Sequence, residues 1–191
     1  ENVVGSYLNL WVPKRIRDSR PKYSMQVVIP KNNKVALKEV KELTTNAIKH
    51  GIMNKGIFSQ AHAKAAGFKV PLKPAAEDGS QAFNCNTEDP PRVFIKRGDK
   101  MVPVNAGTPD ENEIYSGCIC SVVVNFAPYA VKIESGGVSR GVGAYLTYFM
   151  KTDDGPRLDG RISVDAAFEE AVAELGDDLV EEPDSEEDFP F

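Results

Sequence analysis

The feature of this sequence that most restricts its fold is a pair of long strand-forming segments at 117–127 and 141–151. Both segments, GCICSVVVNFA and GVGAYLTYFMK, are rich in β-branched and aromatic residues, which favour a pleated strand over a helix. Two earlier segments, 3–12 and 22–29, alternate apolar and polar residues, and Pro30 ends the second of them. These patterns predict a fold built mainly from β-strands.

Fewer segments have helical spacing. Apolar residues recur at helical intervals over 34–50, with Gly51 as the expected stop, and a second helix is predicted at 58–66, before a loop at 67–80. Short strands are predicted at 82–86, 92–96 and 100–104. Because strands and helices do not alternate regularly, a doubly wound parallel sheet is not expected. We predict a mainly β fold: a five-stranded antiparallel OB-fold barrel with one or two helices and a disordered acidic C-terminal tail.

Charge divides the chain into a basic body and an acidic end. All 23 Lys and Arg residues lie at or before Arg161, and residues 1–164 carry a net charge of +7. From Asp165 onward there are 12 acidic residues and no Lys or Arg. A basic body favours a polyanionic ligand, and an acidic terminal block is typical of an interaction arm. The expected parts are an OB-fold domain that binds the polyanion at 1–163, a short helix or linker at 164–175 and an acidic interaction tail at 176–191.

Several other classes of protein are not expected. No apolar run approaches the roughly 20 residues that span a bilayer, and no signal-peptide pattern begins the chain, so we expect a cytoplasmic protein without a membrane partner. Cys85, Cys118 and Cys120 form no second pair at metal-ligand spacing, so we expect buried thiols, no metal and no cofactor. No nucleophile elbow, phosphate loop or paired histidines occur, so we expect no catalytic residues and no enzyme.

Binding a single strand requires cations along the phosphates and aromatic faces on which unpaired bases stack. Tyr7 and Trp11 precede a basic loop, Tyr129 lies in a predicted Gly-rich loop at 128–140, and lysines in the loop at 67–80 add cations. Core packing is the alternative for each aromatic side chain. The candidate DNA-binding residues are Tyr7, Trp11, Lys14, Arg15, Arg17, Arg20, Lys22, Tyr129, Lys132, Arg140, Tyr145, Phe149 and Lys151.

Two-residue alternation assigns faces to the first and last strands. In the last strand, Leu146 and Tyr148 are predicted on the core face, and Tyr145, Phe149 and Lys151 on the binding face. In the first strand the predicted core face holds Val4, Leu8, Leu10 and Val12. The last strand therefore contributes two aromatics and one lysine to a single surface.

The end of the chain carries the most specific motif, an aromatic-proline-aromatic sequence on a carboxylate-rich arm. A partner would need only a small apolar pocket surrounded by Arg and Lys to hold the last residue. The residues of this candidate partner-binding tail are Glu186, Glu187, Asp188, Phe189, Pro190 and Phe191.

This EEDFPF end resembles the acidic tip of bacterial single-stranded DNA-binding proteins, although Phe189 stands where isoleucine is usual. The body resembles phage-encoded single-stranded DNA-binding proteins in PKYSMQVVIPK, in EIYSGCICSVVVNFAPY, and in GVGAYLTYFMK ahead of DGRISVDAAFEE. The resemblance covers most of residues 3–170. It implies an OB-fold that coats exposed DNA, and Tyr129 matches the position of an aromatic that contacts the strand in that family.

The resemblance also implies a function: binding and protection of single-stranded DNA, without sequence specificity, during phage DNA replication, recombination and repair. It implies that the tail binds replication proteins, such as a polymerase, a helicase-primase or a recombinase, and shields the DNA cleft when DNA is absent. The family includes monomers and homodimers, which leaves the oligomeric state open. Two alternatives also remain open: a protein-interaction module that binds no DNA, and an RNA-binding protein.

Overall fold

The computed structural model describes residues 2–15, 20–53, 56–76, 78–133 and 136–158. All of them lie in one unit of the chain, Glu1–Asp159. A second unit, Gly160–Phe191, falls outside the described residues, and so do the helix expected at 164–175 and the acidic tail.

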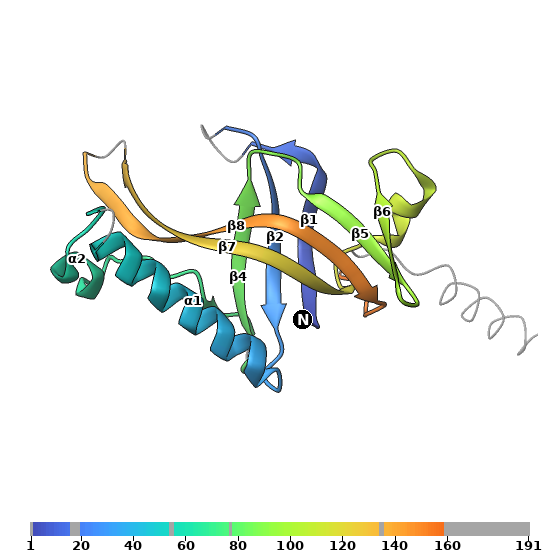
Figure 1. The fold of residues 1–191 in the computed structure, drawn as a ribbon, viewed down its shortest axis with the longest axis horizontal. Helices are drawn as coiled ribbons and strands as arrows, with labels where there is room; N and C mark the ends of the chain where they lie inside the picture. The colour runs from blue at the N-terminus through green and yellow to red at the C-terminus, as the bar shows by residue number, and fades with distance from the viewer. Residues whose placement is uncertain (1, 16–19, 54–55, 77, 134–135, 159–191) are drawn as a thin grey trace, which may run out of the picture. The chain divides into compact units, whose positions relative to one another are not determined.

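The described unit is mostly β-sheet with two α-helices, which confirms the predicted fold class (Figure 1). The helices are α1 (Lys34–Met53) and α2 (Gln60–Lys64), and a short 3-10 helix, η1, covers Pro109–Glu113. The strands are β1 (Val3–Lys14), β2 (Lys22–Ile29), β3 (Lys73–Pro74), β4 (Gln81–Thr87), β5 (Arg92–Arg97), β6 (Lys100–Val104), β7 (Ile119–Lys132) and β8 (Val138–Asp153). None of the helices among the described residues is long and apolar enough to cross a membrane.

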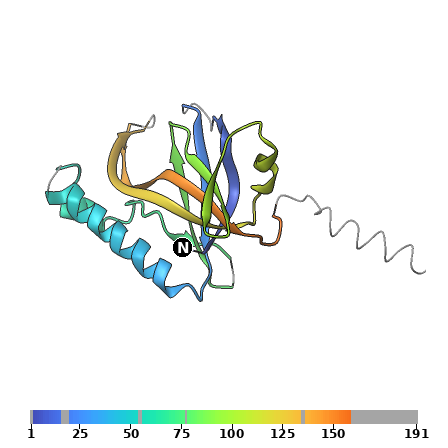
Figure 2. The same cartoon turned by 45° about the vertical axis from the view of Figure 1, so that its right-hand side comes forward.

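Five strands pair in a closed circuit. The pairs β1–β2, β2–β4, β1–β7 and β7–β8 are antiparallel, and a parallel bridge between Asn86 of β4 and Tyr145 of β8 closes the circuit. In both ribbon views the long strands β7 and β8 run crosswise to β1, β2 and β4 (Figures 1 and 2). The number of strands in the circuit agrees with that of the predicted barrel, although the closing bridge is parallel and not antiparallel.

Three strands lie outside this circuit. β5 pairs with β8 in parallel and with β6 in antiparallel fashion, which confirms the two short strands predicted at 92–96 and 100–104. β3 is a two-residue strand beside β4, inside the segment predicted as loop. The sheet therefore has eight strands in the described residues, where the sequence predicted a five-stranded barrel.

The hairpin of β7 and β8 is longer than predicted. Pairing continues without interruption from Ala127 opposite Gly143 to Lys132 opposite Val138, so most of the predicted Gly-rich loop at 128–140 is strand. Gly141 is needed in this strand because a Cβ there would collide with the carbonyl oxygen of Lys69. That carbonyl accepts a hydrogen bond from the Val142 amide at 2.9 Å. The glycine thus marks close approach of a second backbone, and not a turn.

Helix α1 packs its apolar stripe against the sheet. It begins after Asn33, whose side-chain oxygen accepts a hydrogen bond from the Ala36 amide at 3.1 Å. The prediction that Gly51 ends this helix is wrong, because the helix continues to Met53 and Gly51 is buried within it. A Cβ on Gly51 would lie 2.8 Å from Cβ of Pro128, so glycine there allows α1 to approach β7.

The core is formed by apolar side chains from all five strands of the circuit. Cys85, Cys118 and Cys120 are fully buried, which confirms that these thiols pack as small hydrophobic groups. Burial raises the pKa of the Cys85 thiol to about 12. The predicted faces of β1 are only partly correct: Leu10 is buried, but Val12 is 68% exposed because two register shifts interrupt the pairing of β1 with β2.

Candidate nucleic-acid interface

A groove crosses the polar side of the strand circuit. It consists of two adjoining hollows, of about 510 and 480 Å³, lined mainly by residues of β1, β2, β4, β7 and β8. The two hollows share Lys22, Gln26, Asn84 and Asn86, so they form one continuous surface. This surface, called the groove below, contains several of the sequence-predicted binding residues.

Positive charge lines the groove and negative charge does not. Lys14 and Lys22 line the first hollow, and Lys69 and Lys73 join Lys22 in the second. Among the described residues, no Asp or Glu side chain lines either hollow. Lys22 does lie 3.6 Å from Glu88, which is half exposed and also 3.6 Å from Arg20. An open channel with four lysines and no lining carboxylate attracts a polyanion.

Three tyrosines supply aromatic surface along the groove. Tyr7 lines the first hollow, and Tyr129 and Tyr145 line the second. Tyr7 is 73% exposed and lies at the first register shift of β1, where its φ is 49°. A bulky residue in this left-handed region carries backbone strain, and such strain concentrates at functional sites. The Tyr7 carbonyl accepts a hydrogen bond from the Asn9 side chain at 3.1 Å, which supports the bulge.

The ring of Tyr145 lies beside a neighbouring glycine. A Cβ on Gly143 would lie 3.2 Å from the Tyr145 hydroxyl and ring carbons, so the ring occupies the space beside Gly143 on the same face of β8. The Tyr145 side chain is 39% exposed. It therefore offers an aromatic surface to the second hollow without contributing to the core.

Neutral polar side chains form the floor between these aromatics. The side chains of Asn9, Ser24, Gln26, Asn84 and Asn86 all line the groove. The Asn9 amide donates to the Ser24 hydroxyl at 3.2 Å, and the Gln26 amide donates to the Asn84 oxygen at 3.2 Å. The floor can therefore both donate and accept hydrogen bonds.

The sequence-predicted residues separate into two sets. Five of them line the groove: Tyr7, Lys14, Lys22, Tyr129 and Tyr145. Trp11 is half-buried against the core and lines neither hollow. The remaining cations outside the groove are Arg15, Arg20, Lys132 and Arg140. Arg17 and the tail residues Glu186, Glu187, Asp188, Phe189, Pro190 and Phe191 lie outside the described residues.

The predicted binding face of β8 is wrong beyond Leu146. Val123 of β7 pairs with Tyr148 and Val124 pairs with Leu146, so Thr147 is an extra residue that forms a bulge. Residues after the bulge point to the opposite side from that predicted by simple alternation. Phe149 is consequently fully buried and Lys151 is 7% exposed, and neither belongs to the groove.

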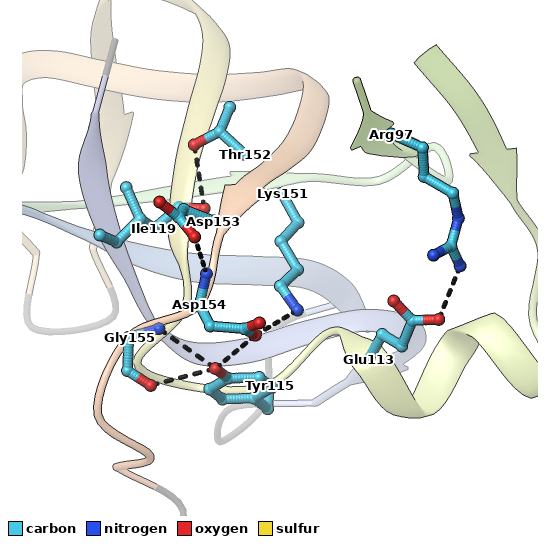
Figure 3. A network of polar contacts seen from close by, with 9 residues as sticks. All are labelled: Arg97, Glu113, Tyr115, Ile119, Lys151, Thr152, Asp153, Asp154 and Gly155. Atoms are coloured by element: carbon cyan, nitrogen blue, oxygen red, sulfur yellow. Dashed lines mark hydrogen bonds and ion pairs between the residues drawn. The ribbon is translucent and has the colours of Figure 1, made fainter. Parts of the chain in front are cut away.

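Lys151 instead belongs to a polar cluster at the C-terminal end of β8 (Figure 3). Its ammonium lies 2.6 Å from Asp154 and 5.0 Å from the centre of the Tyr115 ring, and the Arg157 guanidinium lies 4.2 Å from that ring. The Tyr115 hydroxyl donates to Asp154 at 2.8 Å and accepts from the Gly155 amide at 3.1 Å. This Tyr115 cluster fixes the segment that follows β8.

The charges of this region are mutually compensated. The hydrogen bond from Lys151, and then that from Tyr115, lower the pKa of Asp154 below its ordinary value. Burial raises the pKa of the Tyr115 hydroxyl. Nearby, Arg97 pairs with Glu113 at 2.6 Å and with Asp110 at 3.1 Å. No group of three or more His, Cys, Asp and Glu side chains suited to a metal ion occurs among the described residues.

The amides of the floor were not among the sequence-predicted residues, although their signal was present. In β4, Asn84 and Asn86 alternate with the buried residues Phe83 and Cys85, so both amides lie on the outer face of a half-buried strand. The solvated face of a half-buried strand is usually polar. Two amides in this position indicate that this face of β4 is polar but uncharged.

Comparison with known proteins gives one consistent result. Residues 1–180 match the family described as the single-stranded DNA-binding protein of Enterobacter phage Enc34. No curated protein gives a significant match. Among solved structures, the chain resembles the single-stranded DNA-binding protein from bacteriophage Enc34 in complex with single-stranded DNA, at 21% identity and a TM-score of 0.58, covering 82% of this chain and 86% of that one. A second structure of that phage protein aligns at 22% identity with the same TM-score, covering 87% of each chain. These likenesses support the fold.

Proposed function

Because this chain belongs to the single-stranded DNA-binding protein family of Enterobacter phage Enc34, we propose that its groove is the surface that holds the DNA strand. The observation that carries the proposal is a groove with four lysines, three tyrosines and no lining carboxylate among the described residues. Lysines neutralise phosphates and tyrosines stack on unpaired bases, which are the two contacts that single-strand binding requires. A protein-interaction module would not need this combination.

The proposed contact set differs from the one predicted from sequence. It keeps Tyr7, Lys14, Lys22, Tyr129 and Tyr145, and adds Lys69 and Lys73. The other described residues of the predicted set are left out, among them the buried Phe149 and Lys151. Each tyrosine that stacks on a base contributes about 1–3 kcal/mol to binding. Because every base can stack on a tyrosine, we propose that the protein binds without sequence specificity. We also propose that it acts in replication, recombination and repair of phage DNA in the host cytoplasm.

The test is fluorescence polarisation of a labelled oligo-dT of about 20 nucleotides, longer than the roughly 4–16 nucleotides that one OB-fold occupies. Full-length protein is compared with the variant Lys69→Ala/Lys73→Ala. We expect weaker binding by the variant and a salt dependence that is shallower by about 0.7 for each phosphate that the variant no longer neutralises. The control is Lys38→Ala/Lys41→Ala on α1, which removes the same charge from the exposed helix surface outside the groove.

Equal affinities and equal salt slopes for the groove variant and the wild-type protein would reject the groove as the DNA site. Absence of binding by the wild-type protein at low salt would reject the function itself. Oligo-rU and oligo-dU, which differ only in the 2′-hydroxyl, test the RNA alternative in the same assay, since only a contact to that hydroxyl would favour RNA.

We propose that the acidic tail recruits replication proteins and competes with DNA for the basic surface. Its 12 acidic residues from Asp165 onward and its DFPF end support this role. A protein that ends at Gly176 is expected to bind oligo-dT more tightly at low salt. The variant Phe189→Ala/Phe191→Ala should keep its DNA affinity and lose binding to the phage polymerase, helicase-primase or recombinase. Unchanged binding to all three would refute recruitment through these rings.

A further inference from the structure

Four polar residues are paired one after another across the strands that line the groove. Asn9 of β1 pairs with Ser24 of β2, Ser24 pairs with Asn86 of β4, and Asn86 pairs with Tyr145 of β8. Directly paired residues of neighbouring strands extend their side chains to the same face of a sheet. A second, shorter row of Gln26 opposite Asn84 lies two residues further along the same strands.

These rows occupy the boundary between the two hollows of the groove. Gln26, Asn84 and Asn86 line both hollows, whereas Tyr7 lines only the first and Tyr145 only the second. The cations Lys14, Lys69 and Lys73 belong to one hollow each. A strand that follows the groove must therefore cross the amides as it passes from one tyrosine to the next.

The chemistry of the rows suits the edge of a base. An amide side chain has both a donor and an acceptor, whereas lysine only donates and a carboxylate only accepts. The pairing edge of every nucleobase, the edge that faces the partner base in a duplex, likewise has a donor next to an acceptor. Asn86 has no side-chain hydrogen bond to any described residue, so its amide can rotate to match whichever base lies against it.

We propose that the amides of Asn84 and Asn86 form hydrogen bonds to the pairing edges of unpaired bases, while the tyrosines on either side stack on neighbouring bases. This inference rests on the proposed function and adds a specificity to it. The groove recognises that a base has a free pairing edge, and not which base it is. Single-stranded nucleic acid is then preferred over duplex by hydrogen bonding as well as by stacking.

The test uses three labelled 20-nucleotide strands with the full-length protein: oligo-dT, oligo-dT methylated at N3 of every base, and an abasic strand. N3-methylation removes the imide donor and blocks the pairing edge but keeps the ring. We expect the wild-type protein to bind the methylated strand about two- to tenfold more weakly than oligo-dT, the range that one net hydrogen bond provides. The abasic strand should bind most weakly because it loses stacking too.

The variant Asn84→Ala/Asn86→Ala should bind oligo-dT and the methylated strand equally, and still bind the abasic strand more weakly. The control Asn46→Ala, on the exposed side of α1, should keep the wild-type ratio. Equal binding of oligo-dT and methylated strand by the wild-type protein would overturn this inference and leave the proposed function intact. If the wild-type protein bound none of the strands, the proposed function would fail with it.

Discussion

The groove and the Tyr115 cluster combine the same kinds of residue and use them differently. Both place lysine beside tyrosine, and both take side chains from β8. In the groove the lysines line open hollows in which no described residue places a carboxylate. In the cluster the buried Lys151 lies 2.6 Å from Asp154 and beside the Tyr115 ring. The location of the counter-charge therefore decides whether a lysine and a tyrosine form a binding surface or an internal contact.

This difference has a physical basis. Burying an ammonium group costs free energy unless a carboxylate lies beside it. Because Asp154 pairs with Lys151, the charge of this lysine is neutralised within the protein. An exposed lysine that lines a carboxylate-free hollow keeps its field, which extends over roughly 10 Å at moderate salt and attracts phosphates. Variants of the two regions should consequently separate into those that alter folding and those that alter binding.

The largest expected effect is on folding, from Phe149→Ala. Phe149 is fully buried in the core, so its truncation should lower the free energy of unfolding by about 3–5 kcal/mol. Urea denaturation measures this loss. Oligo-dT affinity of the protein that remains folded should not change. If affinity fell while stability stayed constant, the burial of Phe149 and the bulge that causes it would both be in question.

The next effect is that of Lys151→Ala, which removes a buried stem and the partner of Asp154. We expect the free energy of unfolding to fall by about 2 kcal/mol or more, and Lys151→Met to recover most of the loss because it keeps the stem. The salt dependence of oligo-dT binding should equal that of the wild-type protein. A shallower salt slope for Lys151→Ala would return this lysine to the DNA-binding set.

Tyr145→Ala should show the opposite pattern from Phe149→Ala, although only three residues separate the two positions on β8. Its exposed ring contributes little to the core, so the unfolding free energy should change by less than about 1 kcal/mol. Oligo-dT affinity should fall by about 1–3 kcal/mol, which is roughly five- to 150-fold. Tyr145→Phe should keep most of the affinity. Full affinity for the alanine variant would exclude stacking on this ring.

Tyr7→Gly should separate stability from binding by changing them in opposite directions. The left-handed φ of 49° strains tyrosine but not glycine, so relief of strain should offset the flexibility of glycine and raise the unfolding free energy by up to about 1 kcal/mol. Oligo-dT affinity should fall because the exposed ring is lost. Urea denaturation would measure the change in unfolding free energy, and fluorescence polarisation would measure the change in oligo-dT affinity. If the variant neither gained stability nor lost affinity, Tyr7 would have no role in strain or stacking.

The smallest effect concerns the pH dependence of the Tyr115 cluster. The pKa of Asp154 is below its ordinary value of 3.8 in the folded protein, so its contribution to stability is complete above that value and declines as pH falls through the folded pKa. The difference in urea midpoint between wild type and Asp154→Asn should therefore shrink from pH 5 to pH 3. A difference that grew on acidification would contradict the pairing with Lys151.

How much the sequence could predict is clearest on β8. Alternation places Tyr145 and Leu146 correctly, because the strand is regular up to that point. Nothing in the sequence marks Thr147 as an extra residue, since a bulge depends on how many residues the partner strand places opposite it. The faces of Phe149 and Lys151 are reversed for this reason alone.

The length of the hairpin was mispredicted for a different reason. Gly136 and Gly137 suggest a loop over 128–140, yet strand pairing continues through most of that segment. Gly141 and Gly143 lie in the strand as predicted, but their roles are set by tertiary contacts, because one admits the backbone of Lys69 and the other makes room for the Tyr145 ring. Both functions depend on contacts between groups that the sequence alone does not bring together. The approach of the Lys69 backbone to β8 also carries this lysine from a segment predicted as loop to the edge of the groove, where it becomes part of the site.

The most direct test of the central claim is a map of backbone amide chemical shifts of the full-length protein during titration with oligo-dT. We predict that the largest changes occur along the groove, at Tyr7, Asn86 and Tyr145, and that the amides of Tyr115 and Lys151 change little. Largest changes in the Tyr115 cluster or on the exposed side of α1, with the groove unchanged, would contradict the claim that the groove holds the DNA strand.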